Sequence, residues 1–157
     1  MDKVSNIEKI IIQGHSLKEL NFNMTNILCQ LPTAASNSFF DAIERNLSIK
    51  KLKVAAICQD MEDSKKLKLL LRAIRNNTRL KYLNISENFL TGACFHMLKD
   101  IFFRGHRNIR TLKFYLGSSD RLFNEMFLEL QRFYEELVRR GPSINLKSLI
   151  LSKGNEI

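Results

Sequence analysis

The sequence predicts an α/β protein in which short parallel strands alternate with helices. Two observations support this prediction. A six-residue pattern, apolar-x-x-apolar-x-apolar, recurs five times, in copies that start near residues 17, 49, 80, 109 and 146. Between the copies, apolar residues recur every three or four positions, which is the period of an amphipathic helix. Strands and helices that alternate at such a regular interval form a parallel sheet with the helices packed behind it.

The five copies of the pattern are the predicted strands. They read LKELNF, IKKLKV, LKYLNI, IRTLKF and LKSLIL. Side chains alternate between the two faces of a strand, so we expect the fourth and sixth positions of each copy to point into the core. The segment Ile7-x-x-Ile10-x-Ile12 also fits the pattern but begins shortly before the first copy. We therefore interpret residues 1–16 as an N-terminal cap or an extra strand.

Four amphipathic helices are expected between the strands. Their apolar sides consist of Phe39, Ile43 and Leu47; Leu67, Leu70, Leu71 and Ile74; Cys94, Leu98 and Ile101; and Phe123, Phe127, Leu130, Tyr134 and Leu137. Residues that often cap helix N-termini mark the expected starts, namely Ser36 or Ser38, Asp63 or Ser64, Thr91 and Asp120. The pair Gly141 and Pro142 is expected to end the fourth helix.

The third copy continues into a longer pattern that identifies the type of repeat. Residues Leu80, Leu83, Ile85, Asn88 and Leu90 fill the leucine-rich-repeat pattern L-x-x-L-x-L-x-x-N-x-L. We expect the Asn88 side chain to satisfy backbone groups in the turn that follows the strand. The predicted architecture is a right-handed leucine-rich-repeat solenoid, with about five parallel strands on its concave face and helices on its convex face. It forms a single domain over residues 1–157, and an ordinary α/β domain is the alternative.

The concave face of this solenoid is predicted to be polar and basic. The third, fifth and seventh positions of the copies point to that face, and they include Lys51, Lys53, Tyr82, Asn84, Ser86, Lys113 and Tyr115. The second position is basic in every copy, at Lys18, Lys50, Lys81, Arg110 and Lys147. With strands about 4.8 Å apart, these five form a basic ladder roughly 19 Å long.

The basic ladder and the basic and tyrosine positions of the concave face are the candidate binding residues. They favour a protein partner with an acidic surface. The simpler alternative is that the edge of the sheet must be solvated, because single surface charges contribute little energy.

A second basic group runs along the second expected helix. It consists of Lys65, Lys66, Lys68, Arg72 and Arg75 and continues to Arg79. The spacing places most of these residues away from the apolar side, on the convex surface. A solvated outer face is the simple interpretation. Nucleic-acid binding is less favoured, because aromatic residues are not interleaved with the basic ones as a stacking platform requires.

Composition restricts the class of protein further. The 157 residues include 25 Lys and Arg against 16 Asp and Glu, a net charge of +9 with neutral histidines. This excess favours an acidic protein, a nucleic acid or an anionic membrane as partner. Cys29, Cys58 and Cys94 are widely spaced, so we expect them to be reduced thiols and not disulfide-bonded. No apolar run is long enough for a signal peptide or a membrane span. We therefore expect a cytoplasmic protein.

No catalytic motif supports an enzyme. The three histidines, His15, His96 and His106, form no H-E-x-x-H motif, and the glycines form no phosphate-binding loop. We expect no enzymatic activity, metal or cofactor, and we expect Cys94 to lie in the core.

The stretch from Leu17 to about Leu98 resembles the C-terminal leucine-rich-repeat domain of tropomodulin. The residues that carry the resemblance are LKELNFN, SIKKLKVAAI and above all NNTRLKYLNISENFLTG. The resemblance implies a ribonuclease-inhibitor-like solenoid, no enzymatic activity and binding to actin, at the slow-growing filament end together with tropomyosin. No matched motif identifies an actin-contacting residue. The alternatives are a stand-alone repeat protein (a pathogen effector or a diverged paralogue) that binds another acidic protein, and a nucleic-acid-binding protein that uses the basic faces.

Overall fold

Strands and helices alternate strictly along the chain. The structure is a computed structural model that describes residues 11, 14–23, 33–55, 64–86, 88, 90–105, 108–116, 120–140 and 148–153. In chain order the elements are β1 (Glu19–Asn23), α3 (Thr33–Arg45), β2 (Lys51–Ala55), α4 (Ser64–Asn76), β3 (Tyr82–Asn84), α5 (Gly92–Asp100), the short π-helical segment η1 (Ile101–Gly105), β4 (Thr111–Leu116), α6 (Asp120–Arg140) and β5 (Ser148–Lys153).

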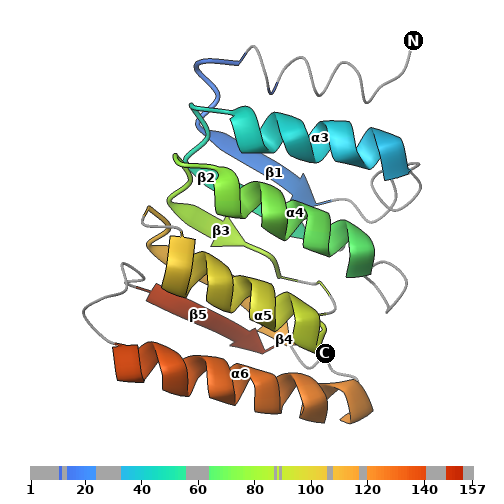
Figure 1. Cartoon of the computed structure of the whole chain (residues 1–157), viewed down its shortest axis with the longest axis vertical. Coiled ribbons are helices and arrows are strands. Elements are labelled where there is room, and N and C mark those ends of the chain that lie inside the picture. Colours follow the sequence, from blue (N-terminus) through green and yellow to red (C-terminus); the bar gives the residue numbers. More distant parts are fainter. Residues whose placement is uncertain are drawn as a thin grey trace.

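The strands form one parallel sheet in the order of the sequence. Its order is β1-β2-β3-β4-β5, and every neighbouring pair is parallel. The register aligns the same position of each repeat, so that Leu52 lies between Leu20 and Leu83. Figure 1 shows α3, α4, α5 and α6 in one layer against one side of the strands. This architecture confirms the predicted α/β class with a parallel sheet, and it is consistent with a leucine-rich-repeat-like fold.

The core lies between the sheet and the helix layer. Leu52, Val54, Leu83 and Ile85, at the fourth and sixth positions of two repeats, are buried. The predicted apolar sides of the second and third helices are buried as well, from Leu67 to Ile74 on α4 and from Cys94 to Ile101 on α5 and η1. Each such side chain contributes about 1.5–3 kcal/mol when it leaves water. The spacing of apolar residues in the sequence therefore explains both where the strands and helices form and which of their sides are buried.

The start and end of α3 differ from the prediction. The helix begins at Thr33, so that Ser36 lies inside it and is buried rather than capping it, and Ser38 is also helical. It ends at Arg45, and Leu47 beyond that end is 65% exposed. The Asn46 side chain stabilises a turn at this point by accepting hydrogen bonds from the backbone. Because of this turn, Leu47 does not continue the apolar side of the helix.

The apolar side of α6 also differs from the prediction. Phe127 and Tyr134 were expected in the core but are 47% and 55% exposed. Phe133 is fully buried instead, with its ring 6.5 Å from that of Phe95 on α5 and 5.8 Å from that of Phe103 on η1. Because α6 packs against α5 through the side that carries Phe133, the side chains of Phe127 and Tyr134 face the solvent.

Four of the predicted helix boundaries agree with the structure. Thr91 caps α5, because its side-chain oxygen accepts a hydrogen bond from Cys94 N at 3.3 Å. α4 begins at Ser64, and α6 extends from Asp120 to Arg140, directly before Gly141. Ile11 of the predicted N-terminal segment Ile7–Ile12 is helical and buried. The rest of that segment, together with Cys29, Cys58, His106 and the side chain of Phe123, lies outside the described residues.

Candidate protein-binding surface

Two asparagines shape the turns that lead from the helices into the strands. Asn46 Oδ1 accepts hydrogen bonds from Ser48 N at 2.8 Å and Ile49 N at 2.7 Å. Asn77 Oδ1 accepts the equivalent bonds from the backbone of residues 79 and 80, and its amide donates to Ile43 O at 2.8 Å and to Asn46 O at 3.0 Å. Each asparagine thus fixes its own turn, and Asn77 also joins it to the preceding repeat.

These two asparagines were not identified from the sequence. The signal was present, because Asn46 and Asn77 both lie three positions before the first apolar residue of their copy. Both are buried, and a buried asparagine that loses its partners costs about 1–3 kcal/mol. They hold the turns directly before the positions of the basic ladder.

Four of the five residues of the basic ladder lie next to one another in the structure. Lys50 N donates to Lys18 O at 2.8 Å, Lys81 N donates to Lys50 O at 2.8 Å, and Arg110 N donates to Lys81 O at 2.9 Å. Lys18, Lys81 and Arg110 are exposed and Lys50 is half-buried. Neighbouring strands about 4.8 Å apart give these four a span of roughly 14 Å. Lys147 lies outside the described residues.

The outer face of the sheet places lysines in two rows across the strands. One row aligns Glu19, Lys51 and Tyr82, and Lys51 forms an ion pair with Glu19 at 3.7 Å. Both partners of this pair are exposed, so it contributes at most about 1 kcal/mol. The other row places Lys53 and Lys113 on either side of Asn84.

The second of these rows differs from the first in burial and pairing. Lys53 and Lys113 are half-buried, and no ion pair to either occurs within the described residues. Both cations therefore remain available to an anionic group. Tyr115 follows on β4, and its side chain lies outside what the structure describes.

The centre of this face is less exposed than predicted. Asn84 and Ser86 are only 5% and 6% exposed, although the sequence indicated solvent-facing positions. Asn84 Oδ1 accepts a hydrogen bond from Ser86 N at 2.9 Å, which ties the pair together. Asn84 has a lysine on each neighbouring strand, and long lysine stems readily cover a short side chain between them. The lysines are thus more accessible to solvent than the asparagine between them.

Asn88 has the role that the repeat pattern predicted. Its amide donates to Val54 O at 2.8 Å, to Ile85 O at 3.0 Å and to Ser86 O at 3.2 Å. These bonds satisfy carbonyl groups of two successive repeats after their strands end. The expectation for Asn88 is therefore confirmed.

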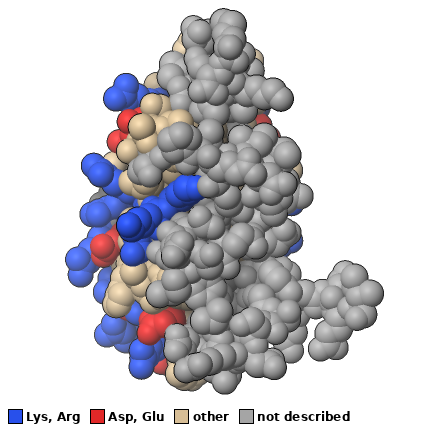
Figure 2. All heavy atoms as spheres, turned by 90° about the vertical axis from the view of Figure 1, so that its right-hand side faces the viewer, with Lys and Arg blue, Asp and Glu red and all other residues tan. Residues whose placement is uncertain are grey.

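The helical side carries a second basic surface along α4. Lys65, Arg72, Arg75 and Arg79 are exposed and Lys68 is half-buried. None of these five forms an ion pair with another described residue. Figure 2 shows Lys and Arg gathered on its left-hand side, where the helix layer lies. The helical side thus carries basic residues of its own, with some acidic residues among them (Figure 2).

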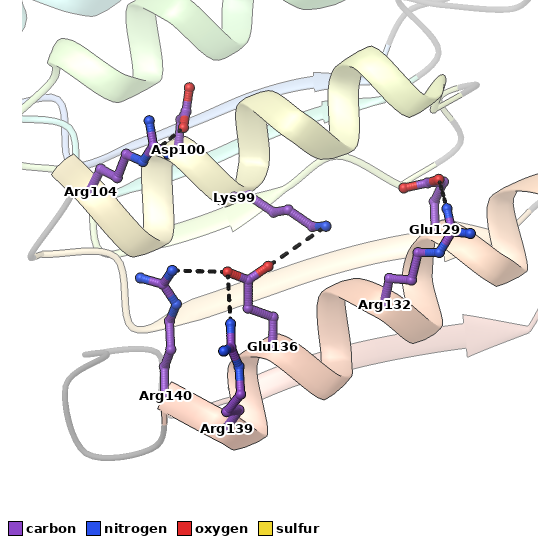
Figure 3. A network of polar contacts seen from close by, with 8 residues as sticks. All are labelled: Lys99, Asp100, Arg104, Glu129, Arg132, Glu136, Arg139 and Arg140. Carbon is purple, nitrogen blue, oxygen red and sulfur yellow. Dashed lines mark hydrogen bonds and ion pairs between the residues drawn. The ribbon is translucent and has the colours of Figure 1, made fainter.

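Several charged residues of α5 and α6 form ion pairs with one another (Figure 3). Glu136 of α6 forms ion pairs with Lys99 of α5 at 3.7 Å, with Arg139 at 3.7 Å and with Arg140 at 3.0 Å. The Arg140 guanidinium also lies 4.7 Å from the centre of the Phe103 ring. Within α6, Arg132 pairs with Glu129 at 2.8 Å. These cations are therefore engaged within the chain.

The described residues show little that could carry covalent or metal chemistry. Cys94 is a free, buried thiol that accepts a hydrogen bond from the Thr91 hydroxyl at 3.3 Å, which confirms its expected place in the core. No group of three or more His, Cys, Asp and Glu residues in the described ranges has a geometry for a metal ion. None of the helices described is both long and apolar enough to cross a membrane.

Comparison with known proteins shows the fold. No family model and no curated protein sequence matches the chain. The structure is similar to a solved structure described as leiomodin-1 actin-binding site 2, with a TM-score of 0.65 and 15% sequence identity over 97% of this chain and 80% of that one. A tropomodulin C-terminal domain from Caenorhabditis elegans matches with a TM-score of 0.43 and 13% identity, over 88% of this chain and 98% of that one. The likeness to the leiomodin-1 domain shows a shared fold.

Proposed function

We propose that this chain is a non-catalytic protein-interaction module that binds an acidic protein surface through its sheet side. The proposed binding residues are the basic ladder, Lys51, Lys53, Tyr82, Lys113 and Tyr115. The observation that carries this proposal is the alignment of four ladder cations on neighbouring strands by backbone hydrogen bonds. Cations held at a regular spacing of about 4.8 Å present one continuous positive edge, which steers and orients an acidic partner.

Actin is the partner that we propose by name. The support is the fold likeness to a domain described as an actin-binding site of leiomodin-1, together with the tropomodulin-like repeat sequence. We place the protein in the cytoplasm, as a right-handed solenoid whose residues 1–157 form one domain. An acidic cellular protein other than actin is the alternative partner for the same surface.

Co-sedimentation with filamentous actin and the elongation rate at the slow-growing filament end test this proposal. We expect the protein to sediment with filaments and to slow elongation at micromolar concentration. The double variant Lys50→Glu plus Lys81→Glu should lower the affinity by about tenfold or more, because charge reversal in an interface acts on both attraction and desolvation. Absence of both binding and inhibition would rule out actin.

A matched control distinguishes the effect of the ladder positions from the effect of net charge. Lys65→Glu plus Lys68→Glu changes the net charge by the same amount on the helical side of the molecule. We expect actin affinity to change far less in this variant than in the ladder variant. Equal losses in the two variants would show that net charge, and not the ladder, determines the binding.

A further inference from the structure

Helices α3 and α4 border a groove on the helical side of the molecule. The two helices lie side by side (Figure 1), and the groove between them has a volume of about 340 Å³. Its lining includes the buried residues Phe40 of α3 and Ala73 of α4 together with polar and charged side chains of both helices. Asn76 of α4 donates a hydrogen bond to Glu44 Oε1 of α3 at 3.1 Å. This bond helps to hold the two helices at a constant separation.

The two walls of the groove carry opposite charges. Asp41 and Glu44 line it from α3, and Arg72 lines it from α4. No ion pair links any of these three residues to another described residue. Each wall is therefore able to pair with a charged group of a molecule that enters the groove.

The basic wall extends beyond the groove along α4. Lys65, Lys68, Arg72 and Arg75 follow one another at intervals of three or four residues, so they lie on one side of the helix. This α4 row is about 15 Å long at 1.5 Å per residue. Like charges at this spacing repel and destabilise a helix. Carboxylates that bind along the α4 row would relieve this repulsion.

We propose that the groove between α3 and α4 binds a helix of a partner protein that carries an acidic row and a basic row. The acidic row pairs with the α4 row, and the basic row pairs with Asp41 and Glu44. A helix is the partner element that presents charged side chains in two adjacent rows at the three- and four-residue spacing of the α4 row. The groove is lined by residues 37–44 of α3 and 69–73 of α4, and the α4 row extends the contact to about 15 Å of the partner helix.

The acidic wall distinguishes this partner from a uniform polyanion. A nucleic acid or an anionic membrane would bring phosphates against Asp41 and Glu44 as well as against the α4 row. A helix with both signs of charge meets each wall with an opposite charge. The proposal is independent of the sheet-side function, because the groove lies on the opposite face of the molecule. Together the two surfaces would allow the chain to join two partners.

Selection from a displayed library of helical peptides of about 20 residues, with the full chain as bait, tests the charge pattern. We expect the enriched peptides to carry Asp or Glu along one side and Lys or Arg along the adjacent side. The best peptide should bind the Arg72→Glu variant about tenfold more weakly than the unmodified chain. Enriched peptides that are uniformly acidic, or a peptide affinity that Arg72→Glu leaves unchanged, would overturn the proposal.

A second measurement tests the role of the acidic wall, Asp41 and Glu44. Asp41→Lys should weaken binding of the selected peptide severalfold and strengthen binding of a short DNA duplex, because it removes an anion that repels phosphate. A control, Lys53→Glu on the sheet side, should leave the peptide affinity unchanged. Tighter binding of the duplex than of the peptide by the unmodified chain, with loss in Arg72→Glu, would overturn the proposal in favour of a polyanion. Asp41 and Arg72 are exposed and Lys53 is half-buried, and circular dichroism verifies that the three variants fold.

Discussion

Helices α4 and α6 carry their charged residues in two different ways. α4 has five basic residues and no acidic one between Ser64 and Asn76. α6 mixes the two signs, and Glu136 alone pairs with three cations. Lys65, Lys68, Arg72 and Arg75 of α4 form no ion pair with a described residue, whereas Glu136 of α6 pairs with Lys99 of α5 and with two arginines of its own helix. The comparison indicates that the charges of α6 serve the fold and that these four cations of α4 remain available for a partner.

The strongest test of the structural role of α6 is the removal of its aromatic anchor. Phe133→Ala should lower the free energy of unfolding by about 3–5 kcal/mol, because the ring is fully buried against Phe95, Phe102 and Phe103. Urea denaturation measures this loss. The neighbouring variant Tyr134→Ala is the control and should cost less than about 1 kcal/mol, because that ring is exposed. Equal losses would mean that α6 is oriented differently.

A smaller effect is expected when α6 is made to resemble α4 in charge. Glu136→Gln removes the shared anion of Lys99, Arg139 and Arg140 and leaves these cations without it. We expect a loss of about 1 kcal/mol in the free energy of unfolding, since the carboxylate is mostly covered. Denaturation at low and high salt measures it, and the difference from the unmodified chain should shrink at high salt. A difference that does not depend on salt would argue against an electrostatic role.

The smallest effect is expected on α4, and with the opposite sign. Lys68→Glu places a carboxylate between Lys65 and Arg72 at helical spacing, so it replaces two repulsions by two attractions. We expect stability to rise by about 0.3–1 kcal/mol at low salt. Chemical denaturation measures the gain, and Lys68→Gln, which removes the charge alone, should produce about half of it. A loss of stability in Lys68→Glu would show that the lysine has a structural role.

The repeat units could be predicted because their signals are local. Strand positions, the buried apolar residues at the fourth and sixth places and the role of Asn88 all depend on spacing within a few residues. The predictions were wrong where a neighbouring residue from another repeat determines whether a side chain is buried. Tyr134 fits an apolar helical stripe as well as Phe133 does, and only the position of α5 determines which of the two is buried. Asn84 has a polar side chain at a solvent-facing position, yet lysines on both adjacent strands flank it.

The same division holds for the candidate site. The sequence by itself determined that basic residues recur at the second place of each repeat, and strand alternation then sends them to one edge. Only the tertiary structure decided that the carboxylates of α3 and Arg72 of α4 line one groove, and that Glu136 reaches Lys99 across two helices. Coulomb interactions depend on distances in space, and residues about 30 positions apart acquire those distances only when the repeats stack.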